Sequence, residues 1–372
     1  MIGGDPGQGG AAWAVLQYVL GLRQLGHDVY LVEPLNPTAV KPGGVALCKS
    51  ENAAYFQQVT SDFGLEGKSS LILDDTFETV GLTYPELRNI ASGTDVLLNI
   101  SGMLKHDDLI GKIPVRAYLD LDPAFNQLWH ATQGIDMRFA VHNRFITVGN
   151  AIGQQDCAIP TCGLPWTRTF QPIVLDHWPR GNGIRYNACT TIANWRGYGS
   201  IQHDGVFYGQ KAHSLRHFMD LPSKSTERFV LALTIHPDER KDIDALNRNG
   251  WTILDPGEVT RTPFMYRDFI QSSKAELGIA KSGYVAARCG WFSDRSVCYL
   301  ASGRPVIAQE TGFSRYLPTG SGLFAFRTGE EALEAVATVV ADYRKQSDAA
   351  RSLAEEHFHS GKVLTRLLEK VA

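Results

Sequence analysis

The sequence predicts an α/β protein built from two doubly wound domains. A length of 372 residues suggests two domains rather than one. Short apolar segments of strand length alternate with segments that show helical periodicity, which is typical of parallel sheets with helices on both faces. Prolines and glycines interrupt this alternation over residues 158 to 183. The hydrophobic fraction of 44% and charged fraction of 20% are ordinary for a globular protein.

The first half opens with MIGGDPGQGG, and a helical pattern follows up to Gly26. The next strand, Val29 to Val32, ends at Glu33. The strand before the helix would comprise only Met1 and Ile2, which leaves open a start upstream of Met1. Further helices are expected at 51–63, 84–91 and 124–130, and further strands at 71–73, 95–100, 115–119 and 145–148.

The second half repeats the same alternation. The change of pattern places the domain boundary near residues 178 to 183, so the domains are 1–180 and 181–350 and a terminal helical segment covers 351–372. Strands are expected at 189–193, 229–233, 251–254, 275–279 and 306–308, and helices at 210–219, 239–249, 263–272, 293–301, 330–343 and 348–371.

Charge and cysteine content restrict the functional class. The net charge of −3 favours neither nucleic acid nor an integral membrane location, although peripheral membrane contact stays open. No apolar run has the length needed to span a bilayer, and no signal peptide is recognised. Six scattered cysteines lack the paired spacing of a metal site and are too sparse for a disulfide scaffold. We therefore expect a cytoplasmic protein without a bound metal.

The most informative segment spans residues 288 to 318. A Gly-Trp-Phe-Ser loop leads into a short helix that begins near Asp294. The turn Ser302 to Pro305 follows, and a strand from Val306 to Ala308 ends in Gln-Glu-Thr-Gly. A helix N-terminus after a glycine loop binds phosphate well, because its free backbone N–H groups and its dipole attract negative charge.

This segment resembles the nucleotide-sugar-binding half of the GT-B glycosyltransferases, with the order Cys-Gly-Trp, Ser and Gly-x-Pro-Val in place. The N-terminal pieces Gly-Gly-x-x-Trp and Leu-Gly-His-Asp-Val resemble bacterial members of the family-1 type. The resemblance implies two Rossmann-like domains that face each other across a cleft. It also implies that the first domain binds the acceptor, the second binds the donor, and the terminal helix packs back on the first domain.

The resemblance implies that the protein itself neutralises the diphosphate of a UDP- or dTDP-sugar, which is a co-substrate rather than a cofactor. Helix dipoles, backbone N–H groups and basic side chains supply this. Gly9 and Gly10 would let the acceptor or the donor phosphate approach the first helix. The expected donor-binding residues are Arg196, Lys211, Gly290, Trp291, Ser293, Asp294, Arg295, Ser296, Glu310, Thr311 and Gly312.

Two departures from the family pattern bear on mechanism. Retaining GT-B enzymes often carry two glutamates across this loop and helix, and those places hold Gly290 and Cys298 here. The missing marker favours an inverting mechanism, which needs a general base from the first domain. The candidates are Asp5, in the loop before the first helix, and Asp120 and Asp122, just after a strand. Turn or N-cap chemistry is the competing explanation for Asp5 and Asp122.

Other functions remain open at this point. A GT-B epimerase would use the same phosphate loop and a carboxylate pair such as Asp294 and Glu310. A catalytically degenerate relative would only bind the nucleotide sugar. A nicotinamide-dependent oxidoreductase has only the loose glycine pattern of GGDPGQGG in its favour. The acceptor is equally open: small aglycones, lipid-linked or polysaccharide acceptors, proteins and nucleic acids all fit the sequence, nucleic acid least because of the charge.

Overall fold

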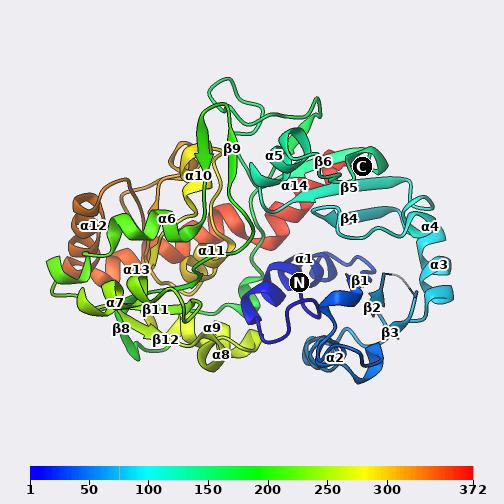
Figure 1. The fold of residues 1–372 in the computed structure, drawn as a ribbon, viewed down its shortest axis with the longest axis horizontal. Helices are drawn as coiled ribbons and strands as arrows, with labels where there is room; N and C mark the ends of the chain where they lie inside the picture. Colours follow the sequence, from blue (N-terminus) through cyan, green and yellow to red (C-terminus); the bar gives the residue numbers. More distant parts are fainter. Residues whose placement is uncertain (75, 372) are drawn as a thin grey trace.

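The computed structural model describes residues 1–74 and 76–371. Two α/β lobes lie side by side, and the segment that leads into the C-terminal helix crosses from one lobe to the other (Figure 1). The described helices of the first lobe are α1 (Gly9–Gln24), α2 (Glu51–Asp62), α3 (Tyr84–Ser92), α4 (Asp107–Ile110) and α5 (Phe125–Thr132). The second lobe and the terminal segment contain α6 (Lys211–Leu215), α7 (Arg240–Arg248), α8 (Pro256–Val259), α9 (Pro263–Ser272), α10 (Ser282–Ala287), α11 (Asp294–Ala301), α12 (Gly329–Ala341), α13 (Tyr343–Leu353) and α14 (Ser360–Val371).

The second lobe is built on one parallel sheet of order β12-β11-β8-β13-β14-β15. Its central strands are buried along nearly their whole length, because helices cover both faces. The five strands expected here are confirmed within three residues, and β15 is an additional one. The strands are β8 (Tyr186–Asn194), β11 (Phe229–Thr234), β12 (Thr252–Leu254), β13 (Ser273–Gly278), β14 (Val306–Gln309) and β15 (Leu323–Phe326).

The first lobe carries two sheets instead of one. Strands β4, β5, β6 and β7 pair in parallel, while β1 pairs in parallel with β2, and β2 pairs antiparallel with β3. The four expected helices and the five strands expected after the first helix are confirmed, with the strand expected at 29–32 shifted to 31–35. The strands are β1 (Leu31–Leu35), β2 (Ser69–Leu73), β3 (Thr79–Gly81), β4 (Val96–Ile100), β5 (Val115–Asp120), β6 (Arg144–Thr147) and β7 (Trp166–Arg168).

Two expectations for the first lobe were wrong. Met1 and Ile2 form no strand, because the backbone N–H groups of Ile2 and Gly4 donate to the Glu33 carboxylate, at 2.9 and 2.8 Å, instead of to a neighbouring strand. The proline-rich region is not wholly irregular: Trp166 to Arg168 pairs with Phe145 to Thr147 as β7. A strand of three residues is too short to show a hydrophobic period.

An antiparallel hairpin was also not expected from the sequence. Strands β9 (Ile201–His203) and β10 (Val206–Tyr208) pair around Asp204 and Gly205, which both have positive φ, at 47° and 76°. An Asp-Gly pair between strand-like segments is a strong hairpin signal, so this element could have been found. Ile201 and Tyr208 of the hairpin pack in one cluster with Phe125 and Leu128 of α5, so the hairpin bridges the two lobes.

The terminal segment ends against the first lobe. The helix α13 continues through a π-helical turn, Ala354–Phe358, into α14. The side chains of Leu364, Leu367 and Val371 pack in one cluster with Tyr18 of α1 and with residues of β5 and β6. Gly21 permits this approach, since a Cβ at this position would lie only 2.5 Å from Leu364 Cδ1.

Candidate active site

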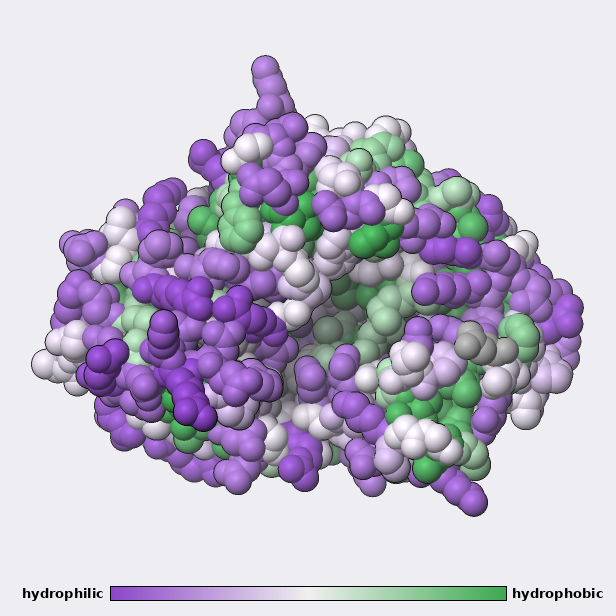
Figure 2. All heavy atoms as spheres, viewed as in Figure 1, coloured by the Kyte–Doolittle hydropathy of each residue, from purple (hydrophilic) through white to green (hydrophobic). Residues whose placement is uncertain are grey.

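A cavity of about 370 Å³ lies between the two lobes. The space-filling view is hollowed near its centre, where the two lobes meet (Figure 2). The walls come from α1, from the end of β5, from residues 171 to 173 of the connecting segment, and from α6, α9, α10 and α11. Open α/β sheets bind ligands beyond the carboxyl ends of their strands, and this cavity lies beyond those of β5 and β13.

The glycine loop before α11 is held in a conformation that a side chain would not permit. Gly290 and Gly312 have φ values of +75° and +96°, and a Cβ on either would lie within 2.8 Å of backbone atoms. The Gly290 N–H donates to the Thr311 carbonyl at 2.9 Å, and the Thr311 hydroxyl donates to the Trp291 carbonyl. These bonds place Trp291 and Ser293 in the cavity wall, directly before the N-terminus of α11.

Three cationic side chains line the cavity: Lys211, Lys281 and Arg295. The Lys211 ammonium donates to the Ile279 carbonyl. Burial among the walls lowers the pKa of Lys211 well below its usual value, and the Arg295 charge lowers it further. Burial also lowers the pKa of Lys281, although Asp122 opposes this effect.

Arg295 is anchored in the second lobe by a buried ion pair. Its Nε donates to Glu276 Oε1 at 2.6 Å, and its Nη1 donates to the Ile192 carbonyl at 3.0 Å. Glu276 is fully buried, and its Oε2 has no hydrogen-bond partner among the described residues. The guanidinium is therefore fixed at the cavity wall, and its orientation depends on Glu276.

Asp122 is the carboxylate of the first lobe on which groups of the second lobe converge. The hydroxyls of Tyr198 and Tyr284 both donate to it, and the Lys281 ammonium lies 3.7 Å from its Oδ2. The same ammonium lies 3.8 Å from the centre of the Tyr198 ring. Asp122 lines the cavity, and its side chain keeps 25% of its surface exposed.

Asp120 lies behind this site and does not line the cavity. Its side chain is fully buried and accepts hydrogen bonds from Asn126 at 2.6 Å, Gln127 at 2.8 Å and Thr147 at 2.7 Å. Burial raises the pKa of Asp120 to about 6, although these three donors act in the opposite direction. The carboxylate therefore holds β5, α5 and β6 together, and its role as a base remains a prediction.

The raised pKa of Asp120 makes the stability of the protein depend on pH. Asp120 binds a proton more tightly in the folded state than in the unfolded chain. The stability that this proton contributes is therefore complete below pH ~4 and is lost as the pH rises through about 6. The difference in stability between the wild type and Asp120→Asn, measured by urea unfolding, should change by about 2 kcal/mol between pH ~4 and pH ~7. Asp95→Asn, at an exposed position, is the control. A difference that does not vary with pH would contradict the raised pKa.

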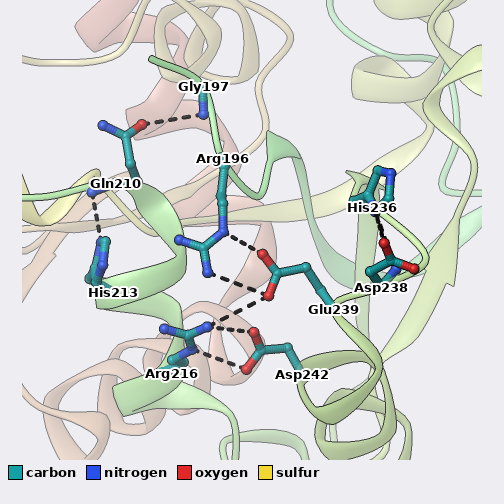
Figure 3. Close-up of polar contacts among 9 residues, drawn as sticks. All are labelled: Arg196, Gly197, Gln210, His213, Arg216, His236, Asp238, Glu239 and Asp242. Carbon is teal, nitrogen blue, oxygen red and sulfur yellow. Dashed lines mark hydrogen bonds and ion pairs between the residues drawn. The ribbon is translucent and has the colours of Figure 1, made fainter. Parts of the chain in front are cut away.

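Arg196 lies outside the cavity walls. It forms an ion pair with Glu239, and Arg216 binds Glu239 and Asp242 beside it (Figure 3). Two carboxylates thus already balance the two guanidinium groups. Arg216 lies in the helical segment expected at 210–219, and Asp242 lies in α7, so these two segments position the cluster. Donor binding by Arg196 stays a prediction and would require a rearrangement of these ion pairs.

The remaining predicted residues divide into two groups. Gly10, Lys211, Trp291, Ser293, Asp294, Arg295 and Asp122 line the cavity. Asp5 does not, and its side chain is 55% exposed in the loop before α1. Glu310 accepts from the Gly312 N–H at 2.5 Å and lies 3.6 Å from Arg327, so it and Asp294 do not form a pair in the cavity. Ser296 is buried at the back of the loop.

Gly9 and Gly10 allow a close approach between helices, not only toward a ligand. The Gly9 N–H donates to the Thr260 carbonyl at 3.0 Å. A Cβ on Gly9 would lie 2.2 Å from the Thr262 carbonyl oxygen, and one on Gly10 would lie 2.6 Å from the Tyr266 ring. The N-terminus of α1 is therefore packed against α9, and only Gly10 of the two reaches the cavity.

Several cavity residues were not foreseen. Lys281 follows the carboxyl end of β13 and precedes Ser282 and Gly283, which is the strand-end position and composition of a ligand loop. That signal could have identified it. Gln17, Tyr18 and Gln171 gave no comparable signal, because a polar residue in a helix or a linker ordinarily faces solvent.

Solved structures with the same architecture were found at low sequence identity. HepE of Anabaena, in complex with UDP-glucose, matches with a TM-score of 0.61 and 12% identity over 99% of this chain and 96% of that one. An α-glucosyltransferase in complex with UDP-glucose and DNA matches with a TM-score of 0.55 and 11% identity over 86% and 95%. Sucrose-phosphate synthase from Thermosynechococcus elongatus matches with a TM-score of 0.50 and 10% identity over 91% and 98%.

The chain therefore has the GT-B fold, with two Rossmann-like domains and a cavity between them. No protein-family model and no curated protein matches it. Within residues 1–74 and 76–371, no helix is both long and apolar enough to cross a membrane. The same residues contain no group of three or more His, Cys, Asp or Glu side chains arranged to hold a metal ion.

Proposed function

We propose that the protein is a glycosyltransferase that moves a sugar from a nucleoside diphosphate to an acceptor. The observation that carries the proposal is the convergence of Lys211, Lys281 and Arg295 on the cavity beside the N-terminus of α11. A diphosphate leaving group carries two or more negative charges, and cations fixed in a confined site stabilise it as the glycosidic bond breaks. The shared fold of solved UDP-sugar complexes supports the same conclusion.

We propose the division of labour that the sequence predicts: residues 1–180 for the acceptor, 181–350 for the donor, and 351–372 returning to the first domain. The first lobe's last strand, β7, ends at Arg168 and the second lobe's first, β8, begins at Tyr186, which supports a boundary between them. We also propose that the reaction is metal-independent, with Lys211, Lys281 and Arg295 supplying the positive charge that stabilises the diphosphate. The donor is a UDP- or dTDP-sugar, and the presence of UDP in the solved relatives supports UDP.

Among the three predicted bases, we propose Asp122 as the proton acceptor of an inverting transfer. It is the one of the three that lines the cavity. A base must lie within hydrogen-bond reach of the attacking hydroxyl, which excludes groups buried behind the wall unless the site rearranges. Tyr198, Tyr284 and Lys281 hold the Asp122 carboxylate in place.

The acceptor is not defined by the fold. The α-glucosyltransferase was solved with DNA, so the fold gives no reason to exclude nucleic acid, and the prediction against it rests on net charge alone. We keep a small-molecule or glycan acceptor as the proposal. An epimerase is less well supported, because Glu310 does not join Asp294 in the cavity.

Calorimetric titration with UDP tests the proposal. The wild type should bind UDP, and Lys211→Met should bind it about 10- to 100-fold more weakly, as expected for a lost charged hydrogen bond. Lys241→Met, at an exposed position of α7, should bind it like the wild type. A wild type that binds neither UDP nor dTDP would overturn the proposal.

The same titration has a proton-linked component. Because burial lowers the pKa of Lys211, a bound diphosphate should raise it again and the complex should take up a proton. This uptake occurs at pH values above the pKa of the ligand-free site, and UDP affinity falls as the pH rises through that range. Titrations in buffers of different ionisation enthalpy should detect uptake in the wild type and less in Lys211→Met.

A further inference from the structure

Each of two buried amide side chains in the cavity wall forms a hydrogen bond through only one of its two polar atoms. Gln17 of α1 accepts from the Val174 N–H at 2.8 Å through Oε1, and its Nε2 has no hydrogen-bond partner among the described residues. Gln171 of the connecting segment donates to the Phe292 carbonyl at 2.6 Å through Nε2, and its Oε1 has none. They are 4% and 6% exposed. The bonded halves fix both amides, which leaves one fixed donor and one fixed acceptor.

Tyr18 and Asp294 lie in the same wall. Tyr18 is 5% exposed, and its hydroxyl has no partner among the described residues. Burial raises the pKa of Tyr18, and the negative charge of Asp294 raises it further. Asp294 is an exposed residue that lines the cavity.

The unpaired polar atoms of Gln17, Tyr18 and Gln171 lower the stability of the protein unless a ligand forms hydrogen bonds with them. A buried polar atom without a partner destabilises the folded state by about 1–3 kcal/mol. Three such atoms belong to residues that line one wall of the same cavity. The set comprises a fixed donor, a fixed acceptor, a hydroxyl and a carboxylate. Sugar hydroxyls match it, because each one both donates and accepts.

We propose that Gln17, Tyr18, Gln171 and Asp294 form the subsite for the sugar ring of the donor, and that this ring is an uncharged hexose. The proposal rests on the proposed function and refines its division of labour: the second domain binds the nucleoside diphosphate of the donor, while residues of the first domain also bind the sugar ring of that donor. The cations Lys211, Lys281 and Arg295 serve the diphosphate, while three of these four residues belong to α1 and the connecting segment. An acidic sugar is disfavoured because its carboxylate would meet that of Asp294 in a confined space.

The variant Tyr18→Phe removes only the unpaired hydroxyl and keeps the ring that packs against β5, β6 and α14. Calorimetry should show UDP binding unchanged and UDP-glucose or UDP-galactose binding about 2- to 10-fold weaker than in the wild type, for one lost hydrogen bond. Tyr118→Phe is a matched control. Tyr118 is fully buried in the same lobe, its hydroxyl also has no partner among the described residues, and it lies outside the cavity wall.

The outcomes separate the subsite from the proposed function. If the wild type binds UDP but Tyr18→Phe and Tyr118→Phe both bind the UDP-hexoses like the wild type, the subsite is wrong and the transferase proposal stands. If neither UDP nor dTDP binds the wild type, both are wrong. If UDP-glucuronate binds the wild type more tightly than the two UDP-hexoses, the assignment to an uncharged sugar is overturned.

Discussion

Asp122→Asn should lower the rate of sugar transfer about 10²- to 10⁴-fold, the range expected when a general base is removed. The amide cannot take a proton from the attacking hydroxyl at neutral pH. Its carbonyl oxygen can still accept from Tyr198 or Tyr284, so the contact between the lobes is weakened rather than lost. Release of UDP from UDP-glucose in water measures the effect without an identified acceptor.

The affinity for UDP separates chemistry from structure in this variant. We expect it to change less than about threefold, since Asp122 belongs to the acceptor lobe and its carboxylate repels rather than binds a diphosphate. Asp156→Asn is a suitable control, because Asp156 pairs with Arg315 outside the cavity wall. An Asp122→Asn protein that retains full activity would remove Asp122 from the chemistry and return Asp5 and Asp120 to consideration.

Arg295→Ala should lose both stability and affinity for UDP. From the sequence, this substitution is expected to weaken donor binding without unfolding the protein. The structure changes that expectation, because the substitution leaves the fully buried Glu276 without its counter-charge. Breaking a buried pair by removing one partner costs about 3–5 kcal/mol. Urea unfolding and calorimetry with UDP measure the two losses.

A double variant keeps this prediction falsifiable even if Arg295→Ala fails to fold. Arg295→Met combined with Glu276→Leu removes both buried charges, and such replacements are often neutral or stabilising. We expect near wild-type stability and at least tenfold weaker UDP binding, since a charged hydrogen bond to phosphate is lost. Wild-type UDP affinity in the double variant would show that Arg295 serves only the ion pair with Glu276.

Local sequence patterns predicted most of the secondary structure. The helix α9 was predicted with its observed bounds, because Thr262 provides an N-cap and Pro263 fits the first turn. The apolar strands of the second lobe were recognised because parallel strands buried on both faces read as continuous hydrophobic runs. The short β7 was missed, because three residues carry no measurable period. The strands of the β9–β10 hairpin are equally short, and only the Asp-Gly turn between them carries a signal.

The sequence by itself determined the phosphate loop. The order of glycine, aromatic, serine and helix N-terminus is local, so its chemistry can be read without knowing the fold. Asp294 and Arg295 were predicted on this basis, and both line the cavity. Their roles in binding remain proposals.

Only the tertiary structure decided which distant residues share the cavity. Asp122 and Lys281 are far apart in the chain, and they meet because the carboxyl ends of β5 and β13 face each other between the lobes. Gln17 and Gln171 meet there because α1 packs beside the connecting segment. Arg196 instead forms an ion pair with Glu239, which follows a different strand, β11. Contacts of this kind depend on packing between elements, which no local pattern encodes.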